Sequence, residues 1–267
     1  MSFGVNHVIL TRFNVSSGYA VPGVSGTHPG LDEGWLERRF ALFETFCLPS
    51  VVRQTQRDFR WLVFFDERTP ERYRTRVREW AAQYDFFLPV FCEVFDNALV
   101  LDRIRDLEAR QTGIRITSRL DNDDMLHPRY VEKMRAIIER HLPLVGRDAE
   151  GCFVSFPVGA CLHKGAVYVQ RYRYNPFTSC VAPATSERTA LDVDHRYVAQ
   201  TAPVYFDWRR PMWCQVIHGE NVANALRGVY WPMGSAFAKA INAIPGRSFG
   251  WRAGEVFRSA WRYLRKR

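Results

Sequence analysis

The chain has 267 residues, of which 47% are hydrophobic, and it carries a formal net charge of +9. The length and the hydrophobic fraction are those of a folded chain and not of an intrinsically disordered one, and they allow one large α/β domain with a buried core. The positive charge favours an anionic partner, such as a phosphate-bearing small molecule or an acidic lipid. Nucleic acid ranks lower, because no recognisable nucleic-acid-binding motif accompanies the charge.

The six cysteines are scattered, with no C-x-x-C pair and no His/Cys spacing of a structural zinc site, which fits a reducing compartment. Residues 1–7 lack a charged segment followed by an apolar one, and no run of 18 apolar residues occurs anywhere. We therefore expect a soluble cytoplasmic protein.

The first half of the chain alternates apolar runs with amphipathic segments, which predicts parallel strands connected by helices. The expected strands are residues 5–13, 59–65, 86–95 and 114–120. The expected helices are residues 35–52, 70–84, 98–110 and 128–141. We expect the helix over 35–52 to kink or end at Pro49.

After Gly151 the pattern changes to short strands, expected over 152–157, 160–163 and 166–170, with Lys164-Gly165 as a hairpin turn. Residues 18–34 are rich in Gly, Pro and Ser and are predicted to form a mobile loop. The final residues, 250–267, contain six Lys/Arg and one acid, Glu255, with apolar side chains along one side of a helix. This tail either docks on its own domain or lies on an anionic membrane.

Three polar segments follow apolar strand runs, where ligands bind in open α/β sheets. They are Thr11 to Asn14, Asp66-Glu67, and the acidic cluster Asp121-Asn122-Asp123-Asp124. If extended geometry persists through Asn122, Asp121 and Asp123 project to one side. Two carboxylates in one site need a cation, and oxygen ligands suit Mg²⁺ or Mn²⁺.

Two other interpretations apply to the acidic cluster. It can be a turn that caps the helix starting near Pro128, and this interpretation stays open. An EF-hand loop counted from Asp121 has Glu132 at position twelve, but Leu126 occupies position six, where glycine is needed. The EF-hand interpretation is therefore excluded.

Four features occur in order along the chain: His7 to Asn14 (HVILTRFN), Asp66, Thr117 to Asp124 (TSRLDNDD), and Trp213 to Asn221 (WCQVIHGEN). With this order the sequence resembles the GT-A glycosyltransferases over about residues 5–225, and more narrowly the rhamnosyltransferase-like family of bacterial surface-polysaccharide enzymes. The resemblance implies a GT-A-like, Rossmann-like mixed sheet flanked by helices. The residue pattern adds a β-rich part, expected to bind the acceptor, and a C-terminal amphipathic helix.

The resemblance also implies an organisation and an activity. Residues 1–150 are expected to bind the nucleotide sugar, 151–248 to bind the acceptor and catalyse, and 249–267 to form the basic tail. The implied activity is metal-dependent, inverting transfer of a hexose or deoxyhexose from a nucleoside-diphosphate sugar to a glycan acceptor in surface-polysaccharide synthesis. Peripheral contact with the inner face of the plasma membrane would involve residues 250–267.

Site residues follow from the same resemblance. Asp66 is similar to the acid that contacts the nucleotide base, and Asp121 to the one near the ribose or the metal. Asp123 is expected to be the main metal ligand, and Arg119 to pair with a phosphate oxygen. Each has a structural alternative, since Asp66 can begin the turn before Pro70 and Arg119 can form an ion pair. Two further residues are expected to line the nucleotide pocket: Thr11 and Arg12.

His218 follows an apolar run and is expected to bind the metal through a neutral imidazole, as late histidines do in GT-A enzymes. Inversion requires a carboxylate that removes the acceptor proton, and Asp194, beside His195, is the first candidate. The alternative bases are Asp192, Glu187 and Glu220. An acceptor platform is expected from aromatic residues that can equally pack in the core: Tyr168, Tyr172, Tyr174, Phe177, Trp208 and Trp213.

Two other functions fit parts of this pattern. A sugar nucleotidyltransferase also places acids around Mg²⁺ on an α/β sheet, but no Gly-rich triphosphate loop with a lysine follows the first strand. A catalytically silent GT-A-like scaffold would bind membrane or a partner through its basic tail. The sugar, acceptor, linkage and oligomeric state do not follow from the sequence, because pocket shape rather than fold selects the sugar.

Overall fold

The computed structural model describes residues 5–15, 31–107, 113–145, 151–218 and 228–230. In these residues the main sheet has seven strands in the order β10-β6-β9-β4-β1-β2-β3. Its parallel part consists of β1 (Val5–Arg12), β2 (Arg60–Asp66), β3 (Phe87–Cys92) and β4 (Ile114–Arg119). The predicted parallel strands of the first half are confirmed.

The second half of the chain extends this sheet beyond β4. Strand β9 (Ser179–Pro183) lies antiparallel to both β4 and β6 (Cys152–Ser155), and β10 (Val204–Phe206) pairs parallel to β6. The sheet is therefore mixed, as expected.

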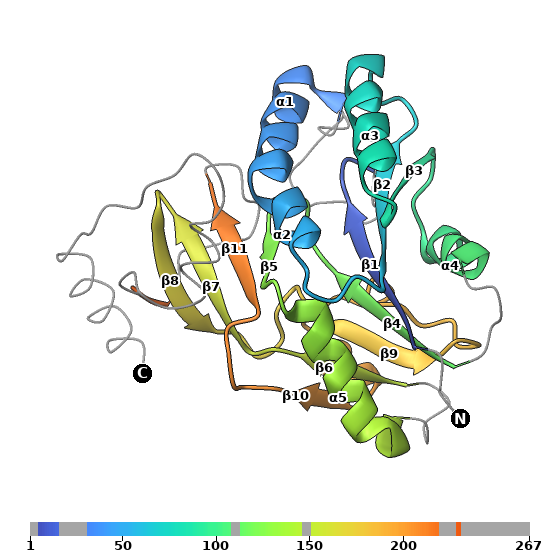
Figure 1. The fold of residues 1–267 in the computed structure, drawn as a ribbon, viewed down its shortest axis with the longest axis vertical. Helices are drawn as coiled ribbons and strands as arrows, with labels where there is room; N and C mark the ends of the chain where they lie inside the picture. The colour runs from blue at the N-terminus through green and yellow to red at the C-terminus, as the bar shows by residue number, and fades with distance from the viewer. Residues whose placement is uncertain (1–4, 16–30, 108–112, 146–150, 219–227, 231–267) are drawn as a thin grey trace.

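A second sheet has the order β12-β8-β7-β11-β5 and lies to the left in Figure 1. Strands β7 (Val158–His163) and β8 (Ala166–Arg171) form the predicted hairpin, and its turn residues, Lys164 and Gly165, both have positive φ. Strand β11 (Trp213–Ile217) pairs parallel to β7 and antiparallel to β5 (Met125–Leu126), while β12 (Val229–Tyr230) pairs with β8. Because β5 directly follows Asp124, the acidic cluster lies where the chain passes from one sheet to the other.

Helices cover both faces of the main sheet, which confirms the expected layers (Figure 1). One face carries α1 (Glu33–Leu42), α3 (Glu71–Gln83) and α5 (Tyr130–Val145), and its core is built largely from aromatic rings. The other face carries α4 (Asn97–Leu107), and the short helix α6 (Val198–Thr201) packs there through Val198.

The irregular part of the first helical segment lies before Pro49 and not at it. Helix α1 continues into a π-helical segment, η2 (Phe43–Cys47), and then into α2 (Leu48–Val52). Pro49 lies in the first turn of α2, where its missing N–H and fixed φ are tolerated. The helical segment continues past Pro49 to Val52, so the predicted end at this residue was wrong.

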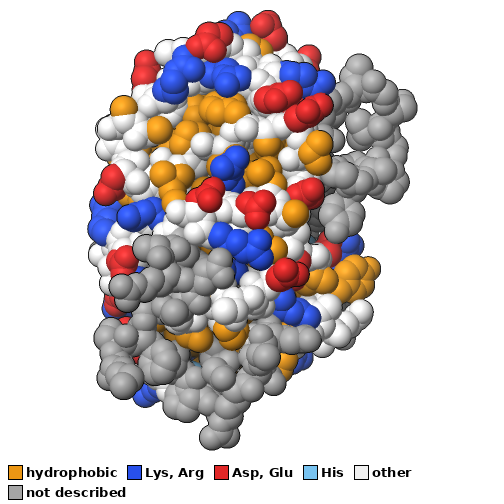
Figure 2. All heavy atoms as spheres, turned by 90° about the vertical axis from the view of Figure 1, so that its right-hand side faces the viewer, with side chains coloured by type: hydrophobic (Ala, Val, Ile, Leu, Met, Phe, Trp, Pro, Cys, Tyr) orange, Lys and Arg blue, Asp and Glu red, His pale blue; other side chains and the backbone are white. Residues whose placement is uncertain are grey.

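Strand β3 is the edge of the main sheet, and it contains Pro89, a residue that edge strands tolerate because one side needs no ladder hydrogen bonds. Figure 2 faces this side of the molecule and shows hydrophobic side chains gathered on its upper part among acidic and basic ones. Charged side chains around an edge disfavour further strand pairing.

Candidate active site

The carboxyl ends of β1, β2 and β4 are joined by two asparagines. The Asn122 side chain donates from Nδ2 to the carbonyl oxygen of Phe13 over 2.7 Å. The Asn14 Oδ1 accepts a hydrogen bond from the backbone N–H of Asp66 at 3.1 Å. The three polar segments singled out in the sequence therefore meet at one edge of the sheet, where parallel α/β sheets bind ligands.

The acidic cluster forms a turn and not an extended segment. Strand β4 ends at Arg119, and the backbone N–H of Asp124 donates to the carbonyl oxygen of Asp121 at 3.2 Å. The condition for a shared direction, extended geometry through Asn122, therefore does not hold, and Asp121 and Asp123 contact different partners. In the first turn of α5, Tyr130 N–H donates to the carbonyl oxygen of His127 and Val131 N–H donates to Gln54 Oε1.

Asp123 lies against His218, 95 residues further along the chain. One carboxylate oxygen, Asp123 Oδ2, lies 2.8 Å from His218 Nε2 and 2.5 Å from Arg39 Nη1. The Asp123 side chain is only 9% exposed, and that of His218 is 17% exposed. The fold thus brings together two residues that the sequence proposed as metal ligands.

The donor set of Asp123 and His218 fits a divalent cation. Adjacent ligand atoms of an octahedral ion with bonds of about 2.0–2.1 Å lie about 3 Å apart, which is close to the separation of these two atoms. Within the described residues no group of three or more His, Cys, Asp or Glu side chains is arranged to hold a metal. Further ligands would then come from phosphate oxygens and water, as is usual for Mg²⁺.

Asp124 forms a hydrogen bond between the acidic cluster and β11. Its Oδ1 accepts a hydrogen bond from the backbone N–H of Val216 at 2.9 Å, two residues before His218. Its Oδ2 is buried and has no hydrogen-bond partner in the described part of the chain. Burial, together with the negative charges of Asp123 and Asp121, raises the pKa of Asp124 well above its ordinary value.

Asp121 turns toward basic residues. Arg119 Nε donates to Asp121 Oδ1 at 3.3 Å. Burial opposes ionisation of Asp121, but the charges of Arg119 and Arg12 outweigh it and lower the pKa of this carboxyl. The charge of Asp121 in turn raises the pKa of Arg119. Arg12, Arg119 and Asp121 therefore form one charged group beside the Asp123–His218 pair.

Asp194 and His195 lie near this charged group. The imidazole Nδ1 of His195 is 3.5 Å from Asp194 Oδ1, and burial followed by the charge of Arg119 lowers the His195 pKa to about 4. Arg196 donates to both Asp194 oxygens, and its hydrogen bond is the largest cause that lowers the pKa of Asp194 well below its usual range. His195 Nε2 also lies 3.3 Å from Tyr172 Oη.

The alternative bases differ in environment. Asp192 has its pKa raised by burial, and its Oδ1 has no hydrogen-bond partner in the described part of the chain. Glu187 has a largely exposed carboxylate, 3.7 Å from Arg105. Glu220 lies outside the described residues.

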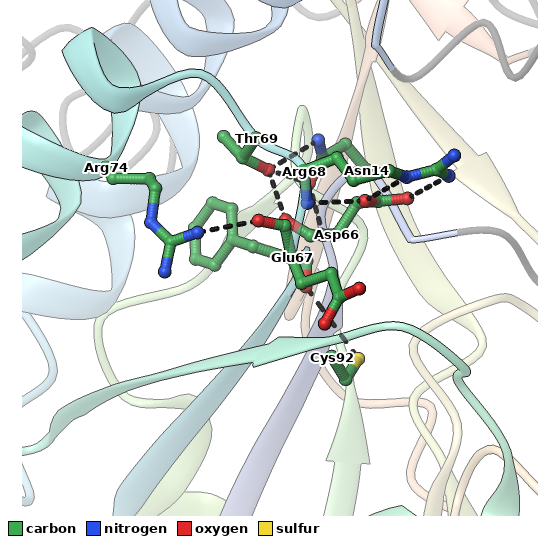
Figure 3. Close-up of polar contacts among 8 residues, drawn as sticks. Asn14, Asp66, Glu67, Arg68, Thr69, Arg74 and Cys92 are labelled. Carbon is green, nitrogen blue, oxygen red and sulfur yellow. Dashed lines mark hydrogen bonds and ion pairs between the residues drawn. The ribbon is translucent and has the colours of Figure 1, made fainter.

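Asp66 combines a position at the ligand edge with a role in its own turn (Figure 3). Its carboxylate accepts two hydrogen bonds from Arg68, Nε to Oδ1 at 3.1 Å and Nη2 to Oδ2 at 2.9 Å. The Thr69 hydroxyl donates to its carbonyl oxygen at 2.6 Å, which builds the turn that was the structural alternative. The side chain of Arg68 is 62% exposed, so a ligand can reach this guanidinium.

Thr11 does not fit its predicted place in the nucleotide pocket. Its side chain is fully buried on the face covered by α1 and α3, and its hydroxyl accepts a hydrogen bond from the indole N–H of Trp61 at 2.9 Å. Side chains alternate along a strand, so Arg12 points the other way and remains half-buried near Asp121.

The expected aromatic platform divides into core and surface. Tyr168, Phe177 and Trp213 are buried, and the last two stack with ring centroids 4.8 Å apart. Trp208 is 47% exposed and lies 6.1 Å from the Phe206 ring. Only the exposed members are available to a sugar.

Arg39 is a site residue that the sequence reasoning missed. It occupies the apolar face of α1, between Leu36, Phe40 and Phe43 in helical spacing. A charge in the middle of an apolar stripe was the signal, because a buried guanidinium needs a partner from elsewhere in the fold.

Comparisons with known proteins place the chain in a family. Among solved structures it is similar to S. aureus TarS 1-349 in complex with UDP, with 10% identity, a TM-score of 0.46, and coverage of 79% of this chain and 60% of that chain. A second S. aureus TarS structure gives 9% identity, a TM-score of 0.47, and coverage of 79% and 37%. A 4-diphosphocytidyl-2C-methyl-D-erythritol synthase structure gives 12% identity, a TM-score of 0.36, and coverage of 77% and 90%.

The matched part therefore spans less than two thirds of both TarS chains. A search of the curated proteins returned no match. Residues 7–230 match the model of the family described as "Putative rhamnosyl transferase", and the chain therefore belongs to this glycosyltransferase family.

Proposed function

We propose that this chain transfers a hexose or deoxyhexose from a nucleoside-diphosphate sugar to a glycan acceptor in surface-polysaccharide synthesis, with Mn²⁺ or Mg²⁺ at Asp123 and His218. The observation that supports it most is the 2.8 Å contact between Asp123 Oδ2 and His218 Nε2 at the carboxyl edge of the sheet. Family membership supplies the reaction class. The two candidate metal ligands, Asp123 and His218, give the position of the proposed metal site.

A divalent ion held there would offset the negative charge that develops on the departing diphosphate. The chain contributes its own cations at the same edge. Arg119 and Arg12 lie beside Asp121, and guanidinium groups match phosphate oxygens in geometry and charge. Arg68, beside Asp66, provides a further exposed cation toward the nucleotide.

Inversion requires a carboxylate that accepts the proton of the attacking hydroxyl. We propose Asp194 for this role because it is ionised at neutral pH and adjoins His195 and the Arg119 group. Asp192 is the competing candidate, since its raised pKa gives it a greater affinity for a proton. Asp194→Asn and Asp192→Asn distinguish them: loss of transfer with retained donor binding identifies the base.

The activity is tested by incubating the protein with a panel of nucleotide sugars, Mn²⁺ and a glycan acceptor, and measuring release of nucleoside diphosphate. We expect Asp123→Asn to reduce release at least about 100-fold, because a lost charge-stabilising contact costs a factor of this order. The matched control, Asp102→Asn, removes an exposed carboxylate on α4 and should leave release unchanged. Absence of both donor turnover and nucleotide binding would falsify the proposal, and pyrophosphate release would identify a nucleotidyltransferase instead.

Membrane contact through the basic tail stays a prediction, since residues 249–267 lie outside the described residues. No helix within the described ranges has the length and apolar character needed to cross a membrane.

A further inference from the structure

Arg39 is a cation buried beside the acidic cluster. Its neighbours on the same face of α1 belong to the core, and only 8% of the residue is exposed. The guanidinium carbon lies 5.1 Å from the centroid of the Trp35 ring, in cation–π geometry. A charge in such a place is retained only when an anion compensates it.

Asp123 is that anion. Arg39 Nη1 donates to Asp123 Oδ2 at 2.5 Å and lies 3.4 Å from Asn122 Oδ1. The Arg39 Nε is buried and has no hydrogen-bond partner in the described residues. One nitrogen therefore contacts the acidic turn while another donor is left unused.

Asp123 Oδ2 is consequently shared by Arg39 and His218. An oxygen of a carboxylate has two lone-pair sites, and two nitrogens already lie within hydrogen-bond distance of this one. A divalent ion on this oxygen would meet the positive charge of Arg39 at short range, where repulsion in a poorly solvated site is strong.

We propose that Arg39 is an exchangeable counter-ion: it neutralises Asp123 in the free protein, and a divalent cation must displace it to bind. This inference rests on the proposed metal site at Asp123 and His218 and adds a residue that sets how tightly the metal is held. The displaced guanidinium becomes available to a diphosphate, whose oxygens match its planar fork. Metal binding to the free protein is then weak, and a diphosphate strengthens it.

The test measures binding of Mn²⁺ alone, from the electron paramagnetic resonance signal of the free ion, to the full chain and two variants. Arg39→Gln removes the competing charge and retains a group that can hydrogen-bond to Asn122. Arg38→Gln is the matched control, because it removes the same charge one residue away from an exposed position on the same helix.

We expect Arg39→Gln to bind Mn²⁺ at least about tenfold more tightly than the wild type, since breaking a buried ion pair leaves an uncompensated carboxylate that attracts the metal. Arg38→Gln should stay within about threefold of the wild type, as expected for an exposed charge. Equal or weaker Mn²⁺ binding by Arg39→Gln overturns the inference, and so does failure of both wild type and variant to bind.

A measurement on the wild type covers the case in which Arg39→Gln does not fold. The Nε–Hε signal of Arg39 in ¹⁵N-resolved NMR, assigned with Arg39→Lys, should shift when Mg²⁺ is added. A signal that stays in place while Mg²⁺ binds overturns the exchange. Sugar transfer without any Arg39 effect on metal affinity would leave the proposed function intact and remove only this inference.

Discussion

Asp124 accepts a hydrogen bond from the backbone N–H of Val216 at 2.9 Å, and this contact extends the pairing of β5 with β11 to the acidic turn. Asp124 therefore contacts β11 two residues before His218, beside the pairing of that strand with β5 and β7. The carboxylates of the acidic cluster therefore differ in their contacts: Asp124 binds the backbone of β11, and Asp123 contacts Arg39 and His218.

Asp124→Ala should destabilise the protein by about 1–3 kcal/mol, because it removes the carboxylate that accepts the hydrogen bond of the buried Val216 N–H. Asp124→Asn retains a carbonyl oxygen and should cost less. The free energy of unfolding from urea titration measures both effects. If the alanine variant is no less stable than the asparagine variant, the hydrogen bond does not have the assigned role.

Asp121 and Asp123 should respond differently to the same substitution. Asp123→Asn removes the carboxylate that contacts His218 and should weaken Mn²⁺ binding at least about tenfold, since a neutral amide is a poor ligand for a hard cation. Asp121→Asn should change it by less than about threefold, because that side chain is directed to Arg119. Calorimetric titration with Mn²⁺ provides the comparison, and equal losses in both variants would show that Asp121 is also a ligand.

His7 makes the stability of the fold depend on pH. Burial, with a further contribution from Arg135, lowers its pKa to about 3. Below pH 6.5 the unfolded chain takes up a proton that the folded protein does not, so stability falls as the pH decreases, by up to about 1.4 kcal/mol per unit for this residue. The loss continues until the pH approaches 3.

His7→Gln removes this proton uptake and retains a group that can reach the Ser118 hydroxyl, which lies 2.8 Å from His7 Nε2. Between pH 6.5 and 4.5 the wild type should lose about 2 kcal/mol more stability than the variant. Denaturant unfolding at several pH values tests this, and parallel pH profiles would exclude His7 as the source.

The ring of Trp213 leaves no room for a side chain at Gly159. A Cβ atom at this position would lie 2.2 Å from two carbons of the buried indole. Gly159→Ala should therefore destabilise the protein by about 1–3 kcal/mol through overpacking. Gly34→Ala is the control: its nearest neighbour is the flexible end of Arg38 at 3.1 Å, and alanine favours the helix by about 0.5–1 kcal/mol. Melting temperatures should move in opposite directions, and a stable Gly159→Ala would contradict the packing.

The order of strands and helices in the first half was predictable because its residues repeat with the periods of the two structures. The apolar run at Phe59 to Phe65 became the buried strand β2, and the stripe through Leu36, Phe40 and Phe43 became the core face of α1. The turn at Lys164-Gly165 was predictable for the same local reason, since its residue types permit positive φ.

Thr11 shows where sequence reasoning failed. Its position near the end of a strand run indicated a ligand contact. In the structure its side chain lies on the core face of β1, where its hydroxyl accepts a hydrogen bond from the Trp61 indole N–H. Which face of a strand meets the ligand depends on what packs against each side, and that is a property of distant segments.

The sequence by itself determined the family, the mixed α/β class and the polar segments at the carboxyl edge of the sheet, because local periodicity and motif order are written along the chain. Only the tertiary structure decided which of these residues meet. The turn at Asn122 separates Asp121 from Asp123, and β11 carries His218 to Asp123. Arg39 reaches the same oxygen from α1. These contacts join residues 84 and 95 positions apart, and no local pattern encodes the direction of a side chain toward a partner so distant in sequence.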